Sequence, residues 1–136
     1  MKNPSLLQDY LKRCQARLKS IDTLYAEKDW PDVVRESQEV VELALKSLLR
    51  YAHIDVPRIH DVSEILTQHK ASFSSVLQKQ IPQMGRISKT LRRDRELAFY
   101  GSEDLTPSDF YSEDDAKEAR NNARWVVGKV LLACKI

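Results

Sequence analysis

The sequence predicts an all-α protein, an up-and-down bundle of four main helices with one or two short connecting helices. Only three glycines occur among the 136 residues. No segment shows the alternation of apolar and polar residues that a half-buried strand requires. Long segments instead repeat apolar residues at spacings of three and four, which places them on one side of a helix. At this length we expect one domain, residues 1–136, with a core that needs no disulfide.

The first two predicted helices follow one another closely. We expect one over residues 5–27, because apolar residues recur at helical spacing throughout it. Trp30-Pro31 then ends this helix and begins the next, since proline suits a first helical turn. The second helix is expected over residues 31–52, where Glu42 and Lys46 stand in the favourable order for an ion pair four residues apart.

Short helices and a third long one are expected in the middle of the chain. Asp61 can cap free backbone amides, with Glu64 in the capping-box position three residues later, so a short helix begins there. A second short helix is expected over residues 75–81. The third long helix is expected to begin at Pro82 and to stop before Gly101.

The last helix has the most explicit start signal. Residues 101–111 contain turn formers and a proline, and they predict a loop. Ser112 then provides an N-cap, and the three acidic residues that follow suit the positive end of the helix dipole. Small and branched apolar residues recur from there to Cys134.

Composition limits the function classes. Twenty-two Lys plus Arg balance 20 Asp plus Glu, so the net charge of +2 does not indicate a nucleic-acid coat or a membrane-binding surface. The chain starts without an apolar signal region and contains no apolar run long enough to span a bilayer, so we expect a cytoplasmic protein. Cys14 and Cys134 are therefore expected as reduced, buried thiols. The three histidines show no ligand spacing, so neither a metal nor a cofactor is expected.

Arg95 is the most unusual residue of the third long helix. Met84, Ile87, Leu91 and Ala98 share one apolar side of that helix, and Arg95 falls within it. A cation in such a position is costly unless it is paired or reaches a water-filled cleft. A buried ion pair, a snorkelling side chain and a functional cleft all remain open on this ground.

Three motifs together resemble the prokaryotic HEPN domain. The second helix ends with the sequence Ala-Leu-Lys-Ser-Leu-Leu (44–49), residues 57–61 read Pro-Arg-Ile-His-Asp before a short helix, and the last helix opens with Asp-Ala-Lys-Glu-Ala (115–119). The resemblance extends from Leu6 to Leu132. It implies a bundle of four or five helices, a homodimer, and a minimal nucleotidyltransferase partner in a toxin–antitoxin-type system. It also implies binding of nucleotide or RNA.

The resemblance also implies where a ribonuclease signature would lie. In the family, an arginine on the penultimate long helix precedes a histidine by four to six intervening residues, usually with a polar residue directly after the arginine. Arg95 and Glu96 occupy the first two positions, but Tyr100 stands near the histidine position. Tyrosine, with an ordinary pKa of about 10, is a poor proton acceptor at neutral pH. The sequence thus keeps the binding half of the signature and loses the proton-transfer half.

Two functions from different classes follow. The first is a homodimeric binding protein in which Arg95 and Glu96, with Arg92 and Lys46, hold a nucleotide or RNA phosphate. The second is a metal-independent endoribonuclease toxin that uses Arg95 with Tyr100 or His60. A third hypothesis is a helical adaptor protein that has no nucleotide-related role.

Overall fold

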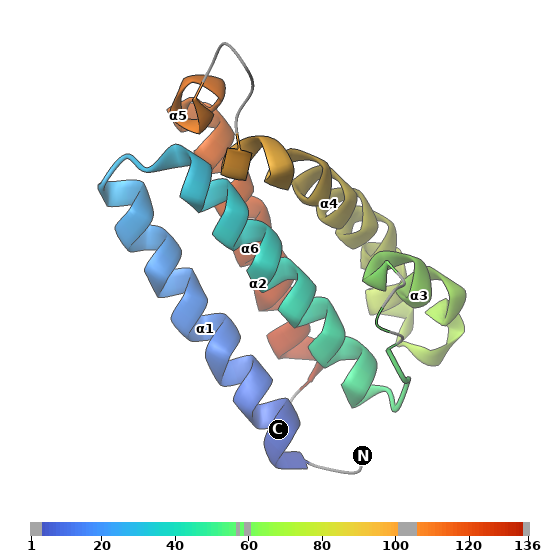
Figure 1. Cartoon of the computed structure of the whole chain (residues 1–136). Helices are drawn as coiled ribbons and strands as arrows, with labels where there is room; N and C mark the ends of the chain where they lie inside the picture. Colours follow the sequence, from blue (N-terminus) through green and yellow to red (C-terminus); the bar gives the residue numbers. More distant parts are fainter. Residues whose placement is uncertain (1–3, 57, 59–60, 101–105, 135–136) are drawn as a thin grey trace.

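The computed structural model describes residues 4–56, 58, 61–100 and 106–134, with residue 4 and residues 94–100 described by their backbone alone. The described residues form an all-α bundle, as predicted (Figure 1). In chain order its elements are α1 (Pro4–Ala26), α2 (Trp30–Tyr51), α3 (Val62–Gln68), a 3₁₀ turn η1 (Lys70–Ser72), α4 (Ser75–Tyr100), α5 (Pro107–Phe110) and α6 (Glu113–Ala133).

The four long helices α1, α2, α4 and α6 run alternately up and down, and the two chain ends lie at the same end of the bundle (Figure 1). Helix α2 occupies the centre, because it packs against α1, α4 and α6. The short helix α3 lies beside the first half of α4. No helix in the described part of the chain combines the length and the apolar character needed to cross a membrane.

The core is densest along α2. Its side chains Leu45, Leu48 and Leu49 are fully buried, and each such leucine stabilises the fold by roughly 1.5–3 kcal/mol. On α6 the residues that face the core begin with alanines, Ala116, Ala119 and Ala123, all buried. These small side chains let the backbones of α6 and α2 approach closely, which is consistent with the close packing of the two helices.

Pro82 does not begin a helix, which corrects the expectation of a short helix followed by a break. Helix α4 runs continuously from Ser75 to Tyr100 with Pro82 in its interior. An interior proline removes one backbone hydrogen bond and costs roughly 3 kcal/mol. Ile81 and Met84, on either side of it, are both buried in the core. Their burial favours one continuous helix and outweighs the local cost of the proline.

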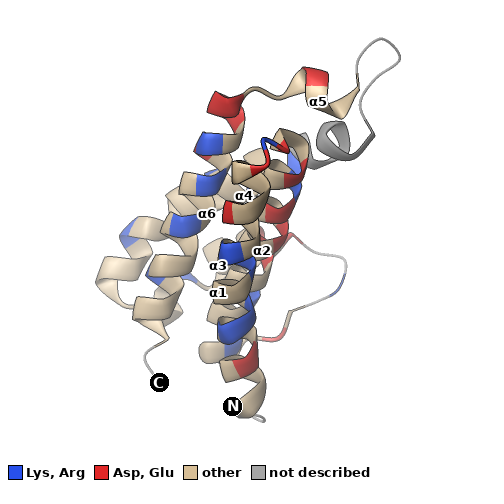
Figure 2. Ribbon diagram, turned by 90° about the vertical axis from the view of Figure 1, so that its left-hand side faces the viewer, with Lys and Arg blue, Asp and Glu red and all other residues tan. Residues whose placement is uncertain are grey.

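The segment expected as a loop before the last helix contains a helix of its own. The four-residue helix α5 begins after Thr106, and the Asp109 carboxylate accepts a hydrogen bond from the Thr106 amide at 3.0 Å. At α6 the predicted cap is confirmed: Asp115 donates its amide to the Ser112 hydroxyl, and the Ser112 amide donates to the Asp115 carboxylate at 2.9 Å. Figure 2 shows acidic residues at α5 and at this end of α6, with basic residues further along α6 and on α1.

Helices α1 and α2 both end in a left-handed residue that is not glycine. Lys28 has φ 60° and His53 has φ 61°. After α1, Asp29 donates to the Leu24 carbonyl and Lys28 to the Tyr25 carbonyl, the two hydrogen bonds of a Schellman motif. The same pair of bonds forms after α2, where Ile54 donates to Leu49 and His53 to Arg50. Lys28 and His53 therefore occupy the position after α1 and after α2 that is usually taken by glycine.

The two cysteines are free and buried, as expected. Burial raises the pKa of the Cys14 thiol to about 11, and burial together with the charge of Cys14 raises the pKa of Cys134 to about 12. Both thiols therefore stay protonated at neutral pH.

Candidate functional site

The residues predicted for the site fall into two groups. Lys46 on α2 and Arg92 on α4 are fully described. Arg95, Glu96 and Tyr100 lie within α4, in the stretch whose side chains fall outside the described residues, and His60 also lies outside them. Of the positions around Arg95, Met84, Ile87 and Leu91 are buried and Arg86, Lys89 and Arg93 are exposed. The predicted orientation of α4 is therefore confirmed up to Arg93.

Arg92 joins three elements of the bundle. Its guanidinium lies 3.5 Å from the Glu42 carboxylate on α2 and 3.7 Å from the Asp61 carboxylate before α3. The Arg92 side chain keeps 40% of its surface exposed, so solvent reaches this cluster. Arg92 thus occupies the flank of the buried side of α4, between two carboxylates that fix the direction of its side chain.

Asp61 is held from its other side by the start of α3. Its Oδ1 accepts hydrogen bonds from the backbone amide and the hydroxyl of Ser63, each at 2.8 Å. Burial alone would raise the pKa of the Asp61 carboxyl, but these hydrogen bonds and the charges of Arg92 and Lys89 lower it. Asp61 therefore caps α3 as predicted, with Ser63 rather than Glu64 completing the cap.

Glu42 pairs with a distant residue instead of the expected Lys46. Its Oε1 lies beside Arg92, and its Oε2 accepts a hydrogen bond from the Gln38 amide at 3.0 Å. A pair four residues apart gains only a few tenths of a kcal/mol on a helix, so a better-placed partner from another helix readily displaces it. Lys46 is left to line the surface next to Glu42.

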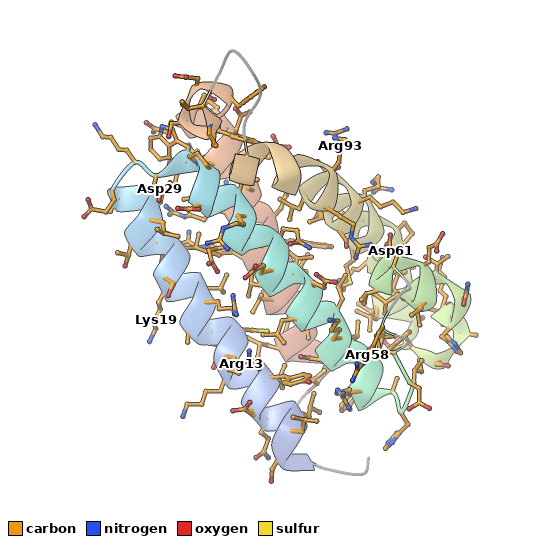
Figure 3. The ribbon with its side chains drawn as sticks, viewed as in Figure 1. Arg13, Lys19, Asp29, Arg58, Asp61 and Arg93 are labelled. Atoms are coloured by element: carbon orange, nitrogen blue, oxygen red, sulfur yellow. The ribbon has the colours of Figure 1, made fainter. Side chains whose placement is uncertain are left out.

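Two adjoining cavities meet at Glu42 and Lys46. One, of about 230 Å³, reaches from them to Tyr10, Arg50 and Arg58. The other, of about 270 Å³, reaches along α1 and is lined by Arg13, Arg17, Glu39 and Leu43 in addition to the shared pair. We call the two cavities together the α1–α2 groove. Figure 3 labels Arg13 on α1 and Arg58 in the loop before α3, and it shows Arg93 pointing outward from α4.

Sequence reasoning named Lys46 as a candidate site residue but missed the other cations and the aromatic ring of this groove. Tyr10 and Arg13 belong to α1, Arg50 lies in the last turn of α2, and Arg58 lies in the loop before α3. Each residue taken singly is an ordinary surface residue. No spacing in the sequence signals that they meet, because they come from three separate segments.

The model of the HEPN domain family matches residues 7–132, nearly the full length. Comparisons with curated proteins and with solved structures give no significant match. The family match supports a helical domain with a nucleotide- or RNA-related role. Together with the all-α bundle, it shows that this chain belongs to the HEPN domain family.

Proposed function

We propose that this protein binds nucleotide or RNA phosphate on the side of α4 that carries Arg92 and Arg95. The single observation that carries the proposal is the placement of Arg92, which is oriented by Glu42 and Asp61 yet remains open to solvent. Arg95 and Glu96 follow three and four positions later on the same helix, so the helical period places positions 92, 95 and 96 on one side of α4. A guanidinium held in a fixed direction is suited to binding phosphate oxygens.

In this proposal the protein binds nucleotide or RNA and does not cleave RNA efficiently. Cleavage of RNA without a metal needs a group that accepts or donates a proton near neutral pH, and histidine suits that role. Tyr100 replaces the histidine of the ribonuclease signature. We therefore expect a degraded signature in which Arg95, Arg92 and Lys46 bind phosphate, while Glu96, a hydrogen-bond acceptor, contacts the nucleotide.

The proposed biological setting comes from family membership. We propose that a minimal nucleotidyltransferase is the partner of this protein in a toxin–antitoxin-type system, and that the protein acts as a homodimer in the cytoplasm. Co-expression with such a nucleotidyltransferase, encoded nearby, followed by size-exclusion chromatography tests the pairing. Separate elution of the two proteins at micromolar concentration would contradict it.

An active endoribonuclease is the second candidate, and one observation favours it. The ion pair with Arg92 places Asp61 against α4, about one helical turn before position 95, and the residue that precedes Asp61 in the sequence lies outside the described residues. The residue at position 60 is a histidine. In this alternative Arg95 stabilises the phosphate, and His60 or Tyr100 transfers the proton.

Binding is tested with Arg95→Ala, and Arg86→Ala is the matched control. Arg86 is an exposed arginine on the same helix, so its removal changes the net charge equally. We expect Arg95→Ala to weaken binding of a labelled RNA or of a nucleotide about tenfold, as loss of one charged hydrogen-bonding contact implies. Arg86→Ala should bind like the wild type. Equal binding by the wild type and Arg95→Ala would remove Arg95 from the site.

Cleavage is tested on total RNA with the same proteins. We expect weak or no cleavage by the wild type, and a gain of activity in Tyr100→His, because this substitution restores the histidine. Efficient cleavage by the wild type would contradict the proposal that the protein binds RNA without cleaving it. In that case loss of activity in Tyr100→Phe or in His60→Ala identifies the proton-transferring residue.

A further inference from the structure

The α1–α2 groove carries a cationic surface, and of its cations the Arg95 site accounts for Lys46 alone. Arg13, Lys46, Arg50 and Arg58 line it or border it. None of these four forms an ion pair with a carboxylate among the residues that the structure describes. They come from α1, α2 and the loop before α3, so one surface gathers cations from three segments.

The carboxylates in the groove are already neutralised. Glu42 faces Arg92, as described above, and Glu39 lies 3.0 Å from the guanidinium of Arg17 and 3.6 Å from that of Arg35. These pairs cancel the negative charge of the groove without involving the four cations. The groove therefore presents a net positive field, although the net charge of the whole chain is only +2.

An aromatic ring lies close to two of these cations. The Arg50 guanidinium lies 5.4 Å from the centre of the Tyr10 ring, and the Arg13 guanidinium lies 5.9 Å from it. Tyr10 is only partly buried, and it lines the groove. Tyrosine rings and guanidinium planes are the surfaces on which unpaired bases stack. The groove therefore combines phosphate-binding cations with a stacking platform.

The volume of the cavity beside Tyr10 favours a chain-like ligand over an enclosed small molecule. Sites that enclose a small molecule usually measure about 300–1,000 Å³, whereas the cavity beside Tyr10 measures about 230 Å³. It has room for about one base or one sugar–phosphate unit, and it shares Glu42 and Lys46 with the second cavity of about 270 Å³ along α1. A strand that places successive units along the groove fits this shape better than an enclosed nucleotide.

We propose that the α1–α2 groove binds a single-stranded RNA segment, with a base on Tyr10 and with phosphates on Arg13, Lys46, Arg50 and Arg58. Through Glu42 the groove reaches Arg92, so the same strand continues toward the Arg95 side of α4. Only the continuation of the strand toward Arg95 rests on the proposed function. The groove extends the contact surface far beyond one phosphate.

The test measures the affinity of a short, unstructured, fluorescently labelled RNA by anisotropy over a series of NaCl concentrations. We expect the double variant Arg13→Ala/Arg50→Ala to bind roughly ten- to a hundredfold more weakly than the wild type. Loss of two phosphate contacts should also reduce the slope of log affinity against log salt by about 1.4, since each contact to a single strand contributes about 0.7. Tyr10→Leu should weaken binding about tenfold through lost stacking and leave the salt slope unchanged.

Two controls make these results specific. Lys12→Ala/Lys19→Ala removes the same charge from exposed positions of α1 that do not line the groove, and Lys19 points away from it in Figure 3. This variant should bind like the wild type. Tyr10→Phe keeps the ring and should retain most of the affinity, which separates stacking from any loss of folding.

The outcomes distinguish this proposal from the proposed function. If Arg13→Ala/Arg50→Ala binds RNA as well as Lys12→Ala/Lys19→Ala does while Arg95→Ala binds weakly, the groove proposal is wrong and the Arg95 site stands. Weak binding by the groove variant with normal binding by Arg95→Ala supports the groove and removes the Arg95 site. If poly-glutamate competes as strongly as RNA, the groove is a general polyanion surface and the proposal is also wrong.

Discussion

Asp61 shows how one carboxylate takes part in both local and long-range structure. It caps α3 through Ser63, and it also pairs with Arg92 on α4. The first contact lies within two residues of the sequence, whereas the second crosses the bundle. A substitution at Asp61 therefore affects both the start of α3 and the direction of the Arg92 side chain.

The stability of the protein should depend on the charge of Asp61. The pKa of this carboxyl is lowered in the fold from its ordinary value of 3.8. Its charge therefore stabilises the fold above that value, and the contribution is lost as the pH falls through the lowered pKa. We expect Asp61→Asn, which can still cap, to show a smaller loss of unfolding free energy below pH ~4 than the wild type. Urea unfolding across acidic pH measures this.

Comparison of Asp61→Ala, which loses both the cap and the ion pair, with Asp61→Asn, which can still cap, separates the two roles. Asp61→Ala should lower the free energy of unfolding at neutral pH by about 1 kcal/mol, the usual cost of a lost N-cap. Identical stability of Asp61→Ala and the wild type would show that the Ser63 contacts do not stabilise α3.

The two thiols should resist modification in the folded protein. Cys14 and Cys134 are buried, and their pKa values of about 11 and about 12 keep them protonated. The thiolate is the reactive form, so iodoacetamide should label neither residue at neutral pH until a denaturant unfolds the chain. Mass spectrometry counts the labels. Rapid labelling of the native protein would contradict the burial of both side chains.

At the scale of the helices, the ends of α1 and α2 are the least regular features. Both use a left-handed residue with a Cβ atom, Lys28 and His53, where glycine is the usual choice. The backbone hydrogen bonds of the two Schellman motifs form nonetheless. These turns therefore carry a conformational cost that the packing of the α1–α2 hairpin offsets.

That cost predicts a stabilising substitution. Lys28→Gly should raise the free energy of unfolding by roughly 0.5–1 kcal/mol, because glycine adopts positive φ without the Cβ clash. The control Lys28→Ala removes the same long side chain but keeps the Cβ atom, so it should not stabilise the protein. Thermal unfolding of the three proteins measures the difference. A gain in both variants would attribute the effect to the lysine charge instead.

At the scale of the whole molecule, α2 connects the candidate site to the core. One side of α2 packs its leucines against the other long helices, while Glu42 and Lys46 reach the groove. Glu42 then contacts Arg92, fifty positions further along the chain. The site is thus formed by the packing of α1, α2 and α4, and unfolding of any of them should abolish it.

A homodimer is predicted at this scale, with α4 and the segment after it contributing to the contact. Members of the HEPN family often dimerise, and an arginine on an apolar helix side is typical of a surface that meets a partner. Light scattering should give twice the chain mass at micromolar concentration, and the melting temperature should rise with protein concentration. A monomer mass throughout that range would refute the prediction.

The helices and their caps could be predicted from residues that lie close together in the sequence. The period of apolar residues located four long helices, and Ser112 and Asp61 marked two starts that the structure confirms. Burial of the cysteines followed from the same period. These features depend on residues within a few positions of one another, which is why the sequence reveals them.

Which distant residues meet could not be predicted from the sequence, because it depends on how the helices pack. Pro82 remains inside α4 because core packing on both sides outweighs its local cost. Glu42 pairs with Arg92 instead of Lys46, and Tyr10 meets Arg50 across the α1–α2 hairpin. Such contacts depend on how the helices pack, and a long charged side chain has many partners within reach on the surface of a bundle. The physical reason is that helix formation is local, whereas the choice of an ion-pair or stacking partner is set by the position of the neighbouring helix.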